Sequence, residues 1–381
     1  MYKAYKFRIY PNETQKIFLH KSFGCVRFIY NYYLSRIKEK GFISAYDCIK
    51  DYTNNLQEEY PFLKEVDSTI LRKELFHLED NLKKYYDNKS FGFPKFKSKY
   101  SKNSYTTSAV YQTYKNKRYC NIELDLMKKE IKLPKLKKVK IRGYRNLTKI
   151  NGKIVNASIS KEANGKYYVS VLYKIEECKN NKIPDSIVGI DIGIKSLVTL
   201  SDGTKIENNR YIKKYEKRIQ KMQKELSRKE KGSKNYYKCK KKINVLYTKL
   251  KNARKYYLHK VTKEITDRYD IITSETLKTK QMIERKKLSK EITDASFFEI
   301  IRQIKYKSEE KGKKFYQINE YYASSQICSR CENKDKKYKN LKEREYRCNV
   351  CNNKEDRDVN ASINIMFEGL KLYMKETHSL V

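Results

Sequence analysis

The sequence predicts a multidomain α+β protein, in which a β-rich domain carries an inserted helical region and is followed by an α/β domain with an inserted helical hairpin. Its 381 residues leave room for two or three domains. The apolar spacing is helical from Glu13 to about residue 90, and it alternates from about residue 106 to residue 180. A new run of apolar strands starts at Ile187 and marks the second fold.

The first half of the chain opens with a strand and continues into helices. Residues 2–10 alternate apolar and basic side chains, and Pro11 and Asn12 end that strand. Apolar residues three and four apart then predict helices from Glu13 to about Lys40 and at about 66–87. Alternating patterns predict five short strands, at 121–126, 130–134, 139–144, 153–160 and 165–175.

The second half has the element order ββ–αα–β–α–β–α, which is typical of α/β folds. It follows a polar linker expected at 178–186. Two long amphipathic helices with Gly232 and Ser233 between them predict the hairpin. The other elements are a strand–turn–strand at 186–203, a strand at 270–277, a helix at about 295–311, a strand at 314–322 and a final helix from about residue 358.

The composition indicates a folded protein that binds a polyanion. Lys and Arg number 87 and Asp and Glu number 45, which gives a net charge of +42. A disordered polycation is excluded because the chain contains 35 Tyr and 14 Phe, whereas disordered segments are poor in aromatic residues. Nucleic acid is the simplest partner for such a charge. No apolar stretch approaches the roughly 18 residues of a membrane span, so no membrane partner is expected.

Four of the nine cysteines form a metal-site pattern. Cys328 and Cys331 make one Cys-x2-Cys pair, and Cys348 and Cys351 make a second pair 16 residues further on. Two such pairs suit one tetrahedral Zn²⁺ held by four thiolates. Because four protein ligands leave no open position, this zinc is expected to fold a small ribbon rather than to catalyse a reaction. The four histidines lie in no nucleophile or metal motif, which disfavours histidine-dependent hydrolases.

Three carboxylates are the candidate catalytic residues. Asp191 lies inside an apolar strand, where a lone carboxylate is costly unless it has a metal or cation partner. Glu275 closes the apolar stretch at 271–275, and Asp358 precedes the last helix, where it can also act as its N-cap. If the three cluster, they require divalent cations such as Mg²⁺ or Mn²⁺. That arrangement is typical of two-metal phosphodiester hydrolysis.

Candidate nucleic-acid contacts come from basic and aromatic residues. Segment 91–105 mixes aromatic residues with lysines and is expected to be a basic loop. Its Tyr105 could stack on an unpaired base or pack in a core, and the sequence leaves both interpretations open. Arg27 and Tyr30 could face a duplex, although packing of their helix is the safer interpretation. The candidate contacts are Arg27, Tyr30, Lys95, Lys97 and Tyr105.

Several motifs resemble those of one known family. Residues 189–203, 274–277, 324–331 and 356–365 resemble the three split RuvC motifs with their embedded zinc ribbon. The segments YKFRIYPNETQ, FGCVRFIYN and FGFPKFKSK resemble the N-terminal half of the same family. Over nearly its whole length, and least at 106–186, the chain therefore resembles the TnpB family of transposon-encoded RNA-guided DNA endonucleases, relatives of type V CRISPR effectors.

The resemblance implies roles for individual residues. Asp191, Glu275 and Asp358 match the first, second and third RuvC carboxylates, which would hold two Mg²⁺ or Mn²⁺ ions. The four clustered cysteines match the zinc ligands. Three positions depart from the family pattern, since Thr276 replaces the usual Asp of Glu-Asp-Leu, and Glu332 and Asn352 replace glycines that commonly follow each cysteine pair. No departure removes a metal ligand, so an active nuclease is expected.

The resemblance also implies a domain plan and partners. A β-barrel-like wedge domain is expected at 1–12 and 106–186, a helical recognition region at 13–105, an RNase H-like RuvC nuclease domain at 187–323 and 357–381, and a zinc ribbon at 324–356. The expected partners are a guide RNA from the transposon end and a double-stranded DNA target that carries a short adjacent motif. The protein is expected to act as a monomer with its RNA in the prokaryotic cytoplasm, associated with the nucleoid.

Four other functions remain to be weighed. A small type V CRISPR-like effector would differ mainly in the source of its guide. A nuclease-inactive RNA-guided repressor usually lacks RuvC carboxylates, whereas all three are present here. A strand-transfer transposase would need a nucleophile such as a His-x-His motif, which the sequence does not contain. A generic zinc-ribbon binder leaves the carboxylate within the apolar strand unexplained.

Overall fold

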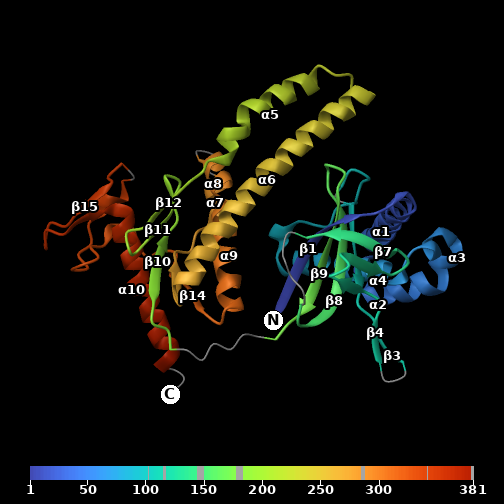
Figure 1. The fold of residues 1–381 in the computed structure, drawn as a ribbon, viewed down its shortest axis with the longest axis horizontal. Helices are drawn as coiled ribbons and strands as arrows, with labels where there is room; N and C mark the ends of the chain where they lie inside the picture. Colours follow the sequence, from blue (N-terminus) through green and yellow to red (C-terminus); the bar gives the residue numbers. More distant parts are fainter. Residues whose placement is uncertain are drawn as a thin grey trace. The chain divides into compact units, whose positions relative to one another are not determined.

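The computed structural model divides the chain into two compact units, Met1–Glu176 and Glu177–Val381 (Figure 1). It describes residues 1–101, 103–114, 117–143, 150–176, 183–284, 288–340 and 342–378. Most of the expected linker at 178–186, namely residues 178–182, lies outside the described residues. Among the described helices, none is both long enough and apolar enough to cross a membrane.

The first unit is built on a seven-stranded antiparallel sheet in the order β2-β8-β9-β1-β7-β6-β5. The N-terminal strand β1 lies between β9 and β7, so the start of the chain joins strands that come more than 130 residues later. The strands are β1 (Tyr2–Tyr10), β2 (Asn103–Ser108), β5 (Glu123–Asp125), β6 (Glu130–Leu133), β7 (Lys137–Arg142), β8 (Lys153–Lys161) and β9 (Tyr167–Lys174). All five strands expected between 121 and 175 are present. The hairpin of β3 (Tyr111–Tyr114) and β4 (Lys117–Cys120) was not expected.

Helices of the first unit pack on this sheet. Helix α1 (Glu13–Lys40) starts after Asn12, whose side chain accepts the Gln15 N–H while the Gln15 side chain accepts the Asn12 N–H. Both α1 and α4 (Ser68–Asp87) contact β2, and they contact each other. The short helices α2 (Ala45–Asp51) and α3 (Gln57–Glu59) connect them. The helices at 13–40 and 66–87 are therefore confirmed, whereas segment 91–105 is a loop only as far as β2.

The second unit contains a five-stranded sheet in the order β12-β11-β10-β13-β14. The strands are β10 (Ile187–Asp191), β11 (Ser196–Leu200), β12 (Lys205–Glu207), β13 (Ile271–Ser274) and β14 (Lys314–Gln317). Strands β10, β13 and β14 are parallel, whereas β11 and β12 are antiparallel to their neighbours. Parallel strands end at the same edge of a sheet, so the residues that follow β10 and β13 lie side by side. The expected strands are present, and β12 is an addition.

Helices cover both faces of this sheet (Figure 1). The C-terminal half of α6 (Lys234–Arg268), together with α8 (Ser289–Ala295) and α9 (Phe297–Glu310), buries apolar residues against one face. Helix α10 (Arg357–His378) packs against β10 and β13 on the other face. The expected hairpin pairs α5 (Tyr211–Ser227) with α6, around a small core of Ile219, Leu246 and Leu250. The short helix α7 (Thr279–Glu284) was not expected.

Two glycines allow α10 to approach the sheet closely. A Cβ atom added at Gly189 in β10 would lie 1.9 Å from the Ser362 carbonyl oxygen of α10. A Cβ atom added at Gly369 in α10 would lie 1.8 Å from the Thr273 Cγ2 of β13. Contacts under 3.0 Å do not occur for real Cβ atoms, so both positions require glycine at this spacing.

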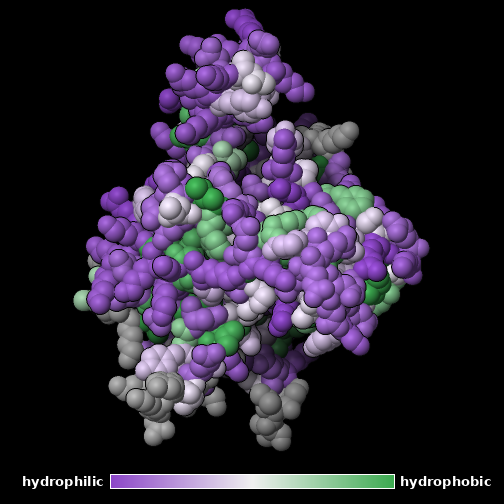
Figure 2. Space-filling model, turned by 90° about the vertical axis from the view of Figure 1, so that its right-hand side faces the viewer, coloured by the Kyte–Doolittle hydropathy of each residue, from purple (hydrophilic) through white to green (hydrophobic). Residues whose placement is uncertain are grey.

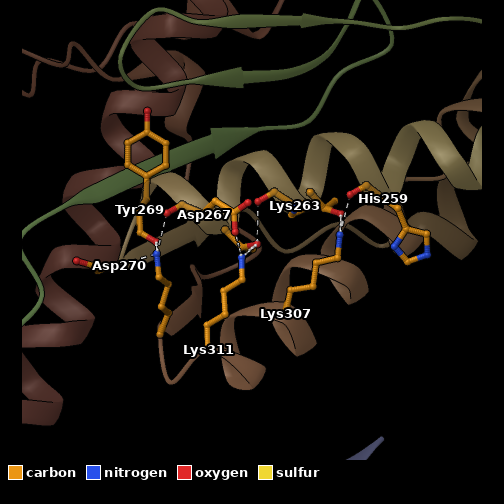
Figure 3. A network of polar contacts seen from close by, with 10 residues as sticks. His259, Lys263, Asp267, Tyr269, Asp270, Lys307 and Lys311 are labelled. Carbon is orange, nitrogen blue, oxygen red and sulfur yellow. Dashed lines mark hydrogen bonds and ion pairs between the residues drawn. The ribbon is translucent and has the colours of Figure 1, made fainter. Parts of the chain in front are cut away.

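Lysines from α9 and the turn after it hold the C-terminal end of α6 (Figure 3). Lys307 Nζ donates to the His259 carbonyl at 2.9 Å, and Lys311 Nζ pairs with Asp267 Oδ1 at 2.5 Å. Lys313 Nζ donates to the Tyr269 carbonyl at 2.9 Å and pairs with Asp270 Oδ1 at 3.2 Å. Cations here complement the partial negative charge at a helix C-terminus, so they fix the base of the hairpin on the sheet.

Candidate functional site

Asp191 and Glu275 meet at the edge of the sheet where two parallel strands end. Asp191 is the last residue of β10, and Glu275 directly follows β13, whose Ser274 is in register with Ile190. Burial and the neighbouring charges of Glu275 and Asp358 raise the pKa of Asp191 far above its usual range. Burial also raises the pKa of Glu275, although hydrogen bonds from Asp191 and the Ile192 N–H oppose this effect. A hydrogen bond joins the two carboxyl groups, and it raises the pKa of Asp191 while it lowers that of Glu275.

Asp358 comes from the last helix of the chain, where it lies in the first turn of α10. The sequence suggested that Asp358 could cap this helix, and the structure corrects that interpretation. The capping carboxylate is Asp356, whose Oδ1 accepts the N–H groups of Asp358 at 3.0 Å and of Val359 at 3.2 Å. Asp356 also pairs with Lys205 at 2.6 Å. Asp358 is thus released from capping, and its charge acts on Asp191.

The three carboxylates form an open group rather than a closed cage. Among the described residues, only the four cysteines bring three or more potential ligand atoms within 4.8 Å of one another. Carboxylate oxygens are the donors that Mg²⁺ and Mn²⁺ prefer, and two neighbouring carboxyl groups whose charges repel are stabilised in their ionised form by a divalent cation. The residues therefore fit divalent cations in their chemistry.

Two arginines lie next to these acids. Arg344 Nη1 is 3.8 Å from Asp358 Oδ1, and the Arg344 side chain is half exposed. Arg357 is buried, donates to the carbonyls of Asn340 and Glu343, and lowers the pKa of Asp191 against the stronger effect of burial. The sequence gave no signal for Arg357.

The residue after Glu275 has an unexpected partner. Thr276 Oγ1 donates to the Ile318 carbonyl oxygen at 2.7 Å. The Ile318 N–H in turn donates to the Ser274 carbonyl at 3.0 Å, so the chain is held on both sides of Glu275. An ionised aspartate at position 276 could not donate this bond.

The four cysteines form a compact thiol cluster. The Cys328 and Cys351 sulfurs are 3.6 Å apart, and those of Cys331 and Cys348 are 3.5 Å apart. A tetrahedral zinc with Zn–S bonds of about 2.3 Å requires sulfurs about 3.8 Å apart, which these distances approach. The pKa of Cys348 is lowered to about 6, mainly by a hydrogen bond from the backbone N–H of Cys351 and to a smaller extent by one from the N–H of Val350. Burial opposes this shift. This donor set fits Zn²⁺.

A small aromatic core and two asparagines attach the ribbon to α10. Tyr338 and Tyr346 pack beside Cys328 and Cys348, while the strands β15 (Glu345–Arg347) and β16 (Lys354–Asp356) pair as a hairpin. Asn360 Nδ2 and Asn364 Nδ2 of α10 both donate to the Ile327 carbonyl at 2.7 Å, one residue before the first cysteine. Both asparagines are buried. The helix that carries Asp358 is therefore bound directly to the ribbon.

Three of the candidate nucleic-acid contacts have partners within the first unit. Tyr30 is 3% exposed and Tyr105 is 5% exposed, so neither ring is available to stack on a base. Lys97 lies 4.0 Å from the centre of the Tyr30 ring and forms an ion pair with the buried Glu74. Its ammonium is therefore paired within the unit, while the side chain stays 37% exposed.

Two of the expected contacts stay predictions. Lys95 is exposed, and Arg27 is half-buried in a surface pocket of about 460 Å³ that Gly24, Phe28, Asn31 and Tyr32 also line. The exposed ring of Phe96 has Lys38 Nζ 4.3 Å from its centre. Figure 2 shows one face of the molecule, on which hydrophilic side chains predominate and apolar ones form small separate patches.

Family models match three parts of the chain. A model described as "Probable transposase" matches residues 170–286, which include Asp191 and Glu275. A "Cas12f1-like, TNB domain" model matches residues 297–365, which include the cysteines and Asp358. A "Helix-turn-helix domain" model matches residues 1–40. In this chain those residues form β1 and the single long helix α1.

Solved structures share the fold at low sequence identity. The Cas12f1 chain in a complex with single guide RNA and target DNA has a TM-score of 0.60 and 15% identity, and the alignment covers 96% of this chain and 98% of that one. The mini-RNA-guided endonuclease CRISPR-Cas_phi3 has a TM-score of 0.51 and 10% identity, with coverage of 97% and 92%. These similarities support a mixed α/β multidomain fold.

Curated relatives match nearly the full length. A "Putative RNA-guided DNA endonuclease" of Streptomyces pristinaespiralis is 30% identical, and the alignment covers 97% of this chain and 89% of that protein. The relative InsQ of Escherichia coli K12, described in the same words, is 29% identical, with coverage of 86% and 83%. The chain therefore belongs to the TnpB-like family of RNA-guided DNA endonucleases.

Proposed function

We propose that this RNA-guided endonuclease cleaves double-stranded DNA by metal-dependent phosphodiester hydrolysis, with Asp191, Glu275 and Asp358 as its catalytic carboxylates. The observation that carries the proposal is the contact between Asp191 and Glu275 at the ends of two parallel strands, with Asp358 close enough to raise the pKa of Asp191. Like-charged acids kept together in this way need cations to become ionised. A pair of ions would accept ligands that are too far apart to share one ion.

The chain's own residues have distinct tasks in this proposal. When bound, two Mg²⁺ or Mn²⁺ ions would activate a water molecule and stabilise the leaving oxygen. Asp191 and Glu275 would hold the cations together with Asp358, and Glu275 accepts the Ile192 N–H, which fixes its orientation. Arg344, beside Asp358, is placed to neutralise charge on a phosphate. The thiol cluster holds a structural Zn²⁺.

The nucleic-acid partners follow the family. A guide RNA from a transposon end would pair with the target strand, and the protein would read a short adjacent motif on the duplex. The first unit would supply the recognition part (13–105) and the wedge (1–12 and 106–186) as far as Glu176, with Arg27 and Lys95 as candidate contacts. The second would supply the RuvC nuclease and the zinc ribbon. We propose that one protein molecule acts with one RNA.

The test is cleavage of a duplex that matches the guide. The protein is purified with its flanking transposon DNA co-expressed, the bound RNA is sequenced, and cleavage is measured with Mg²⁺. Replacing one catalytic carboxylate (Asp191→Asn) keeps the shape of the side chain but removes its charge. The expected result is a loss of cleavage of at least about a thousandfold, with RNA and DNA binding retained.

A matched control is Asp356→Asn, which alters the neighbouring cap of α10 instead of the proposed ligands. It should retain cleavage at reduced protein stability. Unchanged cleavage in Asp191→Asn would refute the assignment of the site. Guided binding without cleavage by the unmodified protein would instead favour a repressor, and random host RNA in the purified complex would contradict guidance.

A further inference from the structure

The chain around Glu275 is attached to the end of β14 at alternate residues. The Ser274 carbonyl accepts the Ile318 N–H at 3.0 Å, and Thr276 Oγ1 donates to the Ile318 carbonyl at 2.7 Å. Two residues later, Lys278 Nζ pairs with Glu320 Oε1 at 2.9 Å. Glu275 lies between the first two attachments, so its backbone is held from both sides by one residue.

The hydroxyl group of Thr276 satisfies a carbonyl that lies in the interior. Ile318 is only 2% exposed, and leaving its carbonyl oxygen without a donor would cost about 1–3 kcal/mol. A hydroxyl group can donate, whereas an ionised aspartate is only an acceptor. The Asp that is usual at this position in the family therefore could not make this bond.

We propose that Thr276 is a positioning residue, whose hydroxyl bond to Ile318 sets the orientation of Glu275 for cation binding beside Asp191. The proposal rests on the proposed function in that it treats Glu275 as a cation ligand. It assigns a task to Thr276, one of the three positions at which this chain departs from the family pattern. Removing the hydroxyl group should weaken cation binding without affecting nucleic-acid binding, because outer residues that orient a ligand typically change metal affinity by about tenfold or more.

The experiment measures Mn²⁺ affinity directly, on the full chain freed of nucleic acid, by electron paramagnetic resonance. Asp191→Ala defines the signal that comes from sites elsewhere. Thr276→Val keeps the shape but removes the donor, and Thr276→Ser keeps the donor. We expect the dissociation constant for Mn²⁺ to rise about tenfold in Thr276→Val and to stay within about twofold in Thr276→Ser. The Mg²⁺ concentration for half-maximal cleavage should rise in parallel.

Two further variants sharpen the result. Lys278→Met breaks the exposed attachment two residues further on and should leave Mn²⁺ affinity unchanged. Thr276→Asp should bind Mn²⁺ as weakly as Thr276→Val does, and Thr276→Ala replaces the valine variant if that protein does not fold. Equal Mn²⁺ affinity in the wild type and the variants that lack the hydroxyl group would overturn the proposal. Because this titration needs no guide or target, its outcome is separate from a failure of the wild-type protein to cleave DNA.

Discussion

Glu332 and Asn352 adopt a backbone conformation that usually belongs to glycine. Each follows the second cysteine of its pair, and their φ angles are 60° and 55°. L-residues are disfavoured in this left-handed region by contact between Cβ and the backbone, although Asn tolerates it. The glycines that are common here in the family have no such cost, so the two departures in the sequence carry a small backbone strain at the thiol cluster.

Relieving that strain should strengthen the ribbon. Glu332→Gly should stabilise the zinc-bound ribbon by roughly 0.5–1 kcal/mol, because the strain removed exceeds the entropy that glycine loses. Asn352→Gly should have a smaller effect. The measurement is the chelator concentration that removes half of the zinc from the purified protein, which should rise by about two- to fivefold for Glu332→Gly. An unchanged or lower concentration would contradict the strain argument.

At the residue scale, the sequence located the acids and cysteines but not their supporting partners. Asp191 can be identified from the sequence because a carboxylate inside an apolar strand is costly to bury unless a cation or metal compensates its charge. For Tyr105 the sequence left a surface and a core position open, because an aromatic residue beside lysines gives the same pattern in both. For Tyr30 it favoured the packing that the structure shows. The cap was assigned to Asp358 rather than Asp356 because helix starts are uncertain by one or two residues. The bond between Thr276 and Ile318 joins residues 42 apart and has no local signal.

Helix α10 links packing to the candidate site. It begins at Arg357, and Asp358 is its second residue, so any shift of the helix along or away from the sheet moves that carboxylate relative to Asp191. Its distance from β10 is limited by Gly189, which faces the backbone of Ser362 and Met366. Backbone cannot move aside as a flexible side chain can, so the fit at this point is strict.

Replacing this glycine should therefore damage both stability and catalysis. Gly189→Ala should destabilise the second unit by about 3 kcal/mol, as overpacked cores do, and displace Asp358. Gly24→Ala is the control for stability, because a Cβ there meets nothing within 4 Å and alanine favours a helix. Thermal unfolding and Mg²⁺-dependent cleavage are the measurements. Equal melting temperatures for Gly189→Ala and the wild type would show that α10 is not confined in this way.

At the element scale, long and strongly periodic segments were predictable, whereas short polar ones were not. The helices α1, α4, α6 and α9 bury regular apolar stripes that are visible in the sequence. The strand β12 has three residues, and β3 and β4 are rich in polar residues, so their pairing gave no alternating pattern. Their positions are set by neighbouring strands instead of by their own composition.

The whole molecule carries a large excess of positive charge, which should make its association with RNA steeply dependent on salt. Each phosphate that is neutralised releases counterions, and the net charge of +42 allows many such contacts. Affinity for the guide RNA should fall by about a thousandfold or more between 50 and 200 mM KCl. Filter binding at several salt concentrations gives the slope. A change of less than about tenfold would indicate that few phosphates are contacted.

At this scale, the polar linker and the new run of strands at Ile187 predicted the division into two units, whereas the pairing within each unit is visible only in the fold. The start of the chain returns to pair with β7 and β9, which no local pattern could indicate. In the second unit, the sequence placed Asp191 and Glu275 on two strands, but that these strands are parallel neighbours is seen only in the structure.

The hairpin of α5 and α6 separates Asp191 from Glu275 in the chain, yet its tip at residues 228–233 lies far along the helices from the strands it connects (Figure 1). Chain length at that turn is therefore uncoupled from the spacing of the acids. Residues inserted at this turn, by evolution or by protein engineering, should therefore leave the relative positions of Asp191 and Glu275 unchanged.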